Sequence, residues 1–129
     1  MKINKIDHIA VNTLDIEESV AFYKRMFGFK EIKRADMGAL TLVYLEICEG
    51  CYIELFDLRG ACEKGERPEA LQGIRHFSLD VDDLRAWEAH LKEEGAEFTL
   101  EYCRMEPIRK DGIIIKDPNG TLIELNADY

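Results

Sequence analysis

The triplet Ile-Glu-Leu occurs twice in this chain of 129 residues, at positions 53–55 and 123–125. Each triplet lies in a stretch with the period-2 alternation of a β-strand, so the glutamate points away from its two apolar neighbours. Glutamate is rarely buried unless a partner compensates its charge, and a mid-strand glutamate usually lies on a solvated sheet face. Two such glutamates in one small protein call for a common explanation.

The duplication extends through the chain. Each half has a histidine early in its first predicted strand and a glutamate in the middle of its last. Equivalent residues recur at a nearly constant spacing, 68 positions for His8/His76 and Asp15/Asp83 and 70 positions for Glu54/Glu124. Because tandem repeats bury a shared core and place equivalent residues symmetrically, we expect the two histidines and two glutamates to have one role.

Hydrophobic periodicity and capping residues predict strand–helix–strand–strand–strand in each half. In the first half we expect strands at 6–11, 30–34, 40–48 and 51–57, and a helix that Asp15 caps, with Glu18 as its capping box, and that ends at Gly28. In the second half we expect strands at 74–81, 97–102, 108–116 and 121–126, and a helix that begins at Asp83 and ends at Gly95. A turn or bulge at Asp111-Gly112 would delay the strand at 108–116. The polar stretch 58–73 is predicted to link the halves.

Length and charge narrow the class of protein. A chain of 129 residues is expected to form one domain. A net charge of −9 argues against nucleic acids and anionic membrane surfaces as partners. No apolar run is long enough to cross a bilayer, and the first residues have no signal-peptide h-region, so we expect a cytoplasmic protein.

The cysteines Cys48 and Cys51 form a C-x-x-C pair, which is compatible with half a zinc site or a redox pair. Glu49-Gly50 between them resembles a two-residue hairpin turn. We therefore interpret both as reduced structural thiols on neighbouring strands.

Two imidazoles and two carboxylates that converge from four strands would hold a divalent metal ion. The candidate ligands are His8, Glu54, His76 and Glu124. Two carboxylates balance the charge of a dication, and open coordination positions would admit a substrate oxygen. Imidazole suits nickel, zinc and iron, and carboxylate also accepts manganese. Taken singly, each histidine is more typical of a core or rim residue; the repeated pattern favours the metal. His90 lies outside the pattern and is expected at the surface.

Two groups of residues carry a resemblance to a known family: 8–11, 19–23 and 27–29 near the start, and 117–120 leading into 123–125 near the end. They resemble the vicinal oxygen chelate superfamily, and within it the glyoxalase I-like (lactoylglutathione lyase-like) metalloenzymes. The resemblance implies an α+β fold, with two tandem βαβββ modules at about 5–57 and 74–126 forming an open mixed-sheet barrel around the metal. It also implies that His8 lies beside Glu54, that His76 lies beside Glu124, and that the chain forms a homodimer.

The resemblance implies a lyase or isomerase that acts on a small substrate with vicinal oxygens. One divalent ion (nickel, zinc, cobalt or manganese, less readily iron) would bind those oxygens and stabilise an enediolate, and Glu124 or Glu54 would move the proton. Glu124 is the preferred base.

Alternatives within the superfamily stay open. They are a methylmalonyl-CoA epimerase-like isomerase, an iron(II) dioxygenase, a thiol transferase and a binding protein without catalysis. Glyoxalase I enzymes typically hold glutathione with an arginine and an asparagine where this chain has Asn12 and Leu58, so glutathione is in doubt as co-substrate. Candidate substrate contacts are Arg104, Arg109 and Lys110 for an anion, and Tyr44, Tyr52 and Phe56 as pocket walls. For each, an ordinary solvated charge or a core aromatic is at least as common.

Overall fold

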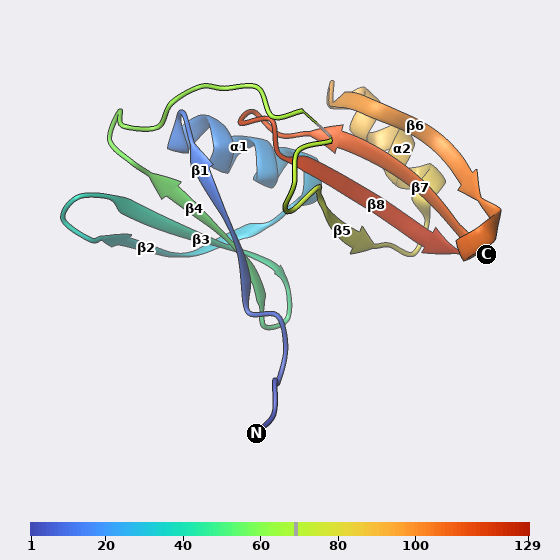
Figure 1. The fold of residues 1–129 in the computed structure, drawn as a ribbon, viewed down its shortest axis with the longest axis horizontal. Coiled ribbons are helices and arrows are strands. Elements are labelled where there is room, and N and C mark those ends of the chain that lie inside the picture. Colours follow the sequence, from blue (N-terminus) through green and yellow to red (C-terminus); the bar gives the residue numbers. More distant parts are fainter. Residues whose placement is uncertain (69) are drawn as a thin grey trace. The chain divides into compact units, whose positions relative to one another are not determined.

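The computed structural model describes residues 1–68 and 70–129, which form two compact units, 1–64 and 65–129. Each unit has the predicted order strand–helix–strand–strand–strand (Figure 1). Unit 1 contains β1(His8–Thr13), α1(Ile16–Phe27), β2(Lys30–Asp36), β3(Thr41–Cys48) and β4(Cys51–Asp57). Unit 2 contains β5(Phe77–Asp80), α2(Leu84–Glu93), β6(Glu97–Met105), a 3-10 turn (Glu106–Ile108), β7(Lys110–Lys116) and β8(Leu122–Asp128). Residue 69, in the predicted linker 58–73, lies outside the described residues.

The two sheets have the same topology. Their strand orders are β1-β4-β3-β2 and β5-β8-β7-β6, and the first strand of each unit runs parallel to its last. Ala10 is opposite Glu54 in one sheet, and Ser78 is opposite Glu124 in the other. The predicted α+β fold of two βαβββ modules is therefore confirmed.

One helix covers one face of each sheet: α1 packs on β4, and α2 packs on β7 and β8 (Figure 1). The strand residues on these faces alternate with the glutamates, as the period-2 pattern predicts. Ile53 and Leu55 in β4, and Ile123 and Leu125 in β8, are fully buried. The opposite faces therefore hold Glu54 and Glu124. Neither helix, within the described residues, is long and apolar enough to cross a membrane.

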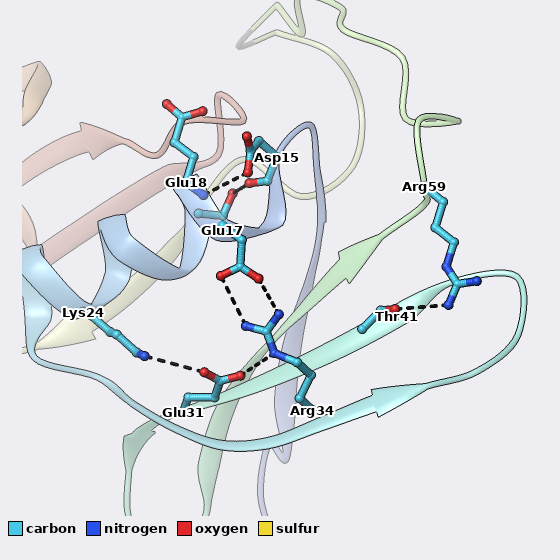
Figure 2. Close-up of polar contacts among 9 residues, drawn as sticks. Asp15, Glu17, Glu18, Lys24, Glu31, Arg34, Thr41 and Arg59 are labelled. Atoms are coloured by element: carbon cyan, nitrogen blue, oxygen red, sulfur yellow. Dashed lines mark hydrogen bonds and ion pairs between the residues drawn. The ribbon is translucent and has the colours of Figure 1, made fainter.

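Both predicted N-caps form. The Asp15 carboxylate accepts a hydrogen bond from the Glu18 amide at 3.0 Å (Figure 2), and Asp83 accepts one from the Ala86 amide at 3.0 Å. Gly28 ends α1 with φ of 69°, in the left-handed region that glycine enters at no steric cost.

Arg34 ties α1 to the sheet of unit 1. Its guanidinium contacts the carboxylates of Glu17 on α1 and Glu31 on β2, and Lys24 reaches the second oxygen of Glu31 at 3.5 Å (Figure 2). These groups are partly exposed, so each pair contributes little stability.

The reason Arg34 faces the helix is a one-residue bulge at Ile32. Glu31 pairs with Leu45 and Lys33 pairs with Tyr44, so Ile32 has no paired residue on β3. Without the bulge, every later residue of β2 would change face. With it, Arg34 lies on the side of α1, and Lys33 shares a face with Tyr44.

Several strand limits differ from the prediction. β1 begins at His8 rather than residue 6, and β5 begins at Phe77 rather than 74, because its partner β8 starts only at Leu122. β8 starts late because residues 117–121 form a turn in which the Asp117 carboxylate accepts hydrogen bonds from two backbone amides, those of Asn119 and Thr121.

The β6–β7 hairpin also differs. β6 continues to Met105, and the turn is closed by Arg109 with φ of 55°. β7 starts at Lys110 and not at residue 108, in agreement with the later start that was considered for this strand. Asp111-Gly112 lies inside β7, and the irregularities lie on β6, between Phe98 and Leu100 and between Leu100 and Cys103.

The C-x-x-C pair is as predicted. Glu49 and Gly50 form the turn between β3 and β4, Cys48 is opposite Cys51, and both are free thiols.

Ile115→Ala should lower the free energy of unfolding by about 2–5 kcal/mol, because Ile115 is fully buried and truncation leaves a cavity. Ile108→Ala is the matched control, since Ile108 is 62% exposed and should change stability by no more than about 0.5 kcal/mol. Urea unfolding followed by circular dichroism measures both; equal effects would contradict the burial described here.

Candidate metal centre

In unit 1 the parallel pairing of β1 and β4 brings His8 and Glu54 together. Nε2 of His8 lies 3.1 Å from a carboxylate oxygen of Glu54, whose side chain is 8% exposed. Nδ1 of His8 lies 2.9 Å from the Asp7 carboxylate. The Asp7 carboxylate can only accept, so Nδ1 donates to Asp7 and Nε2 is the ring nitrogen that faces Glu54.

In unit 2 the pairing of β5 and β8 produces the same arrangement. Nε2 of His76 lies 3.2 Å from a carboxylate oxygen of Glu124, whose side chain is 16% exposed. Nδ1 of His76 is buried and has no hydrogen-bond partner in the described part of the chain. The repeat therefore preserves the histidine–glutamate contact but not the carboxylate behind the histidine.

The two glutamates differ in their cross-strand neighbours. Tyr44 is opposite Glu54, whereas Ile114 is opposite Glu124. A hydrogen bond to Glu54, together with burial, raises the pKa of Tyr44 to about 12, and its ring lies edge-on to His8 at 5.9 Å. Glu54 is therefore held by a neighbouring hydroxyl, and isoleucine can offer Glu124 no such bond.

A cavity of about 430 Å³ lies in unit 1 beside the His8–Glu54 pair. Its wall includes Asp7, Tyr44 and Tyr52, and Tyr52 is opposite His8 in the sheet. Tyr44 and Tyr52 thus line a pocket, one of the two roles considered for them, whereas Phe56 is not part of the wall.

The structure brings the four candidate residues together as two pairs, one in each unit. Among residues 1–68 and 70–129, no group of three or more His, Cys, Asp or Glu side chains is arranged to hold a metal ion.

Comparison with known proteins shows the family. Residues 5–125 match the model of the Glyoxalase/Bleomycin resistance protein/Dioxygenase superfamily. The chain belongs to this superfamily.

Two relatives of similar length match across nearly the whole chain. YaeR of Escherichia coli (strain K12) is 33% identical, covering 95% of this chain and 95% of YaeR. YwkD of Bacillus subtilis (strain 168) is 34% identical, covering 97% and 98%. Among solved structures, a glyoxylase/bleomycin resistance protein/dioxygenase domain from Frankia sp. EAN1pec superposes with a TM-score of 0.85 at 18% identity, covering 99% and 94%.

Relatives whose names state an activity differ in reaction. They include a metallothiol transferase of Bacillus licheniformis and a mitochondrial methylmalonyl-CoA epimerase of Dictyostelium discoideum, both 28% identical, and a probable lactoylglutathione lyase of Vibrio cholerae, 26% identical. Membership of the superfamily therefore does not choose among a transferase, an epimerase and a lyase.

The donor set fits the divalent metal that members of this superfamily typically bind. In each pair an imidazole nitrogen, Nε2, lies beside a carboxylate oxygen, at 3.1 and 3.2 Å, and both atom types are ligands of divalent ions. A cation bound between the imidazole and the carboxylate of a pair would offset the cost of burying the glutamate. His8 and Glu54 supply these donors in unit 1, and His76 and Glu124 supply them in unit 2.

The cationic side chains considered as substrate contacts in this superfamily member are engaged within unit 2. Arg104 makes two hydrogen bonds of 2.9 Å to Asp111. Arg109 donates to the Tyr129 carbonyl at 2.9 Å, and Lys110 contacts Asn126 and Asp128, each at 2.8 Å. All three therefore have partners in the chain itself.

Sequence reasoning missed the polar residues beside the candidate ligands. Asn126, two positions after Glu124, accepts from Lys110 and donates to Ser78 at 2.5 Å. Asp7 was also missed. The Asp7-His8 dipeptide was the available signal, because a carboxylate behind a metal-binding histidine is a common arrangement. His90, expected at the surface, is half-buried against Trp87.

The Asp111 carboxyl should titrate near pH 2. Hydrogen bonds from Arg104 and Tyr102 lower its pKa from 3.8 to about 2. Because the folded-state pKa is depressed, this group contributes stability above pH 4, and that contribution is lost as pH falls from 4 to 2. Carboxyl carbon NMR should show the midpoint returning toward 4 in Arg104→Gln. Arg109→Gln is the control and should leave it unchanged; a wild-type midpoint near 4 would contradict the assignment.

Proposed function

We propose that this chain is a divalent-metal-dependent lyase or isomerase of the glyoxalase I type. It would bind one metal ion through His8, Glu54, His76 and Glu124 and move a proton between neighbouring carbons of a small substrate with vicinal oxygens. The supporting observation is the histidine–glutamate contact, present in both units at 3.1 and 3.2 Å. Nickel, zinc, cobalt and manganese suit such a nitrogen and oxygen donor set.

A bound cation would supply Lewis-acid chemistry, drawing charge from the two substrate oxygens and so acidifying the C–H bond of the carbon next to the carbonyl group. The protein residues have separate tasks. Asp7 fixes the tautomer and orientation of His8 through its bond to Nδ1. A carboxylate within reach of the acidified carbon accepts the proton and returns it to the neighbouring carbon.

Glu124 is our choice for that base. Glu54 faces the Tyr44 hydroxyl, and its side chain is more deeply buried, so it is restrained. Glu124 faces Ile114, is twice as exposed, and has Gly112 nearby, where an added Cβ would approach its Oε1 to 3.4 Å. The missing side chain at Gly112 leaves Glu124 more room to move than Glu54 has.

The co-substrate need not be glutathione. The positions that hold its tail in glyoxalase I enzymes are Asn12, which is exposed on β1, and Leu58, which is half-buried after β4. A methylmalonyl-CoA epimerase-like isomerase is the second candidate. It would also remove a proton next to a carbonyl group, returning it to the opposite face of the same carbon, and a relative of that name matches 95% of this chain. We propose that the active form is a homodimer.

Protein purified without chelators should contain about one divalent ion per chain. His8→Ala and His76→Ala should each weaken metal binding at least tenfold, as loss of a ligand costs no less than loss of an outer-shell partner. His90→Ala is the matched control and should bind like wild type. Metal analysis and calorimetric titration measure this; variants that bind the metal as tightly as wild type would rule out the proposed ligands.

Glu124→Gln should lower kcat by about 100-fold or more, the range expected for loss of a general base. The metal-loaded protein would be assayed with the methylglyoxal–glutathione hemithioacetal and with methylmalonyl-CoA. Glu101→Gln, at a site whose side chain is 75% exposed, is the control. If Glu124→Gln turned over either substrate at the wild-type rate with metal bound, Glu124 would not be the base.

A further inference from the structure

The cavity of unit 1 has a mostly apolar wall with one available positive charge. Besides the two tyrosines, Ile32, Ala35, Met37 and Leu42 line it. Lys33 lines it too, and within residues 1–68 and 70–129 its ammonium group has no ion pair or hydrogen bond. The size of about 430 Å³ lies in the range of small-molecule pockets.

The other charges near the cavity are already compensated. Asp7, the carboxylate in the wall, binds Nδ1 of His8 at 2.9 Å and faces Lys5 at 3.8 Å. Glu31, two residues before Lys33, forms ion pairs with Arg34 and Lys24. A ligand that enters the cavity therefore meets Lys33 as a cation still lacking its counter-ion.

The bulge at Ile32 puts this cation in line with the candidate metal ligands. Lys33 is opposite Tyr44 on β3, and Tyr44 is opposite Glu54 on β4. Residues directly opposite each other point to the same side of a sheet, and neighbouring strands lie about 4.8 Å apart. The backbone of Lys33 is therefore roughly 10 Å from that of Glu54, across two strand spacings.

We propose that this cavity binds the part of the substrate remote from the reacting carbons, an apolar chain or ring that ends in an anionic group paired with Lys33. This inference rests on the proposed function, since Glu54 and His8 mark the reacting end. It makes Lys33 a specificity-determining residue. The apolar wall takes the middle of the substrate, and Tyr44 lies between its two ends.

Binding of probes without vicinal oxygens tests the cavity independently of turnover. The probes are 3-phenylpropionate, 2-phenylethyl phosphate and the uncharged 3-phenylpropionamide, titrated into metal-loaded protein by calorimetry. One or both anions should bind about fivefold more tightly than the amide, as expected of an ion pair at a partly exposed site. The two anionic probes separate a carboxylate substrate from a phosphate substrate.

Lys33→Gln should abolish the preference for the anion. Lys30→Gln is the matched control, since Lys30 is on the same strand, is exposed and is not part of the cavity wall. Both variants change the net charge equally, so a loss confined to Lys33→Gln is local. The methyl NMR signal of Met37 should shift on binding, while that of Met105 in unit 2 should not.

Three results would overturn the proposal: equal affinity for amide and anions, an unchanged preference in Lys33→Gln, or binding that leaves the Met37 signal in place. Failure of the cavity and failure of the reaction are distinguishable. The first leaves metal content and the effect of Glu124→Gln intact, and the second leaves probe binding intact.

Discussion

The parallel pairing between the first and last strand of each unit is the constraint on which the candidate site depends. A parallel pair needs a crossover connection, and here the helix and two further strands provide it. The pairing aligns β1 with β4 and β5 with β8 so that a histidine and a glutamate distant in sequence become neighbours. Because the side-chain period of a strand is 2, the same alignment buries Ile53 and Leu125 on the helix side.

This arrangement places two largely buried carboxylates, Glu54 and Glu124, each beside an imidazole ring. Glu54 is almost fully buried, and Nε2 of His8 lies 3.1 Å from its carboxylate. Glu124 faces the same type of ring. A cation bound beside each pair, as we propose, would offset the cost of burying its carboxylate.

The two units are alike in backbone and unlike in chemistry. Unit 1 has Tyr44 beside its glutamate and an apolar cavity next to it. Unit 2 has Ile114 at the equivalent position. Beside His76 and Glu124 it has a series of hydrogen bonds from Lys110 to Asn126 and from Asn126 to Ser78. The two units thus supply two similar pairs of donors, and the residue opposite each glutamate differs, tyrosine for Glu54 and isoleucine for Glu124.

Much of this was accessible from the sequence, and the reasons are local. Period-2 alternation located the glutamate strands, Asp15 and Asp83 marked the helix starts, and the repeat spacing matched His8 with His76. The register shifts were not accessible, because a bulge such as that at Ile32 is decided by pairing with another strand. The partners of Arg104 and Lys110 were missed for the same reason: Asp111 and Asn126 meet them only across the sheet.

The bulge at Ile32 affects which molecules the cavity accepts but does not affect the candidate metal ligands. β2 is one of the two edge strands of its sheet and pairs only with β3, whereas His8 and Glu54 are on β1 and β4 at the other side of the sheet. If β2 slipped by one residue and lost the bulge, Lys33 would turn to the helix side and Arg34 to the open side, while the ligand strands kept their register. Descendants of such a chain could inherit identical metal chemistry and still diverge in the molecules they accept, through a length change of one residue in a peripheral hairpin.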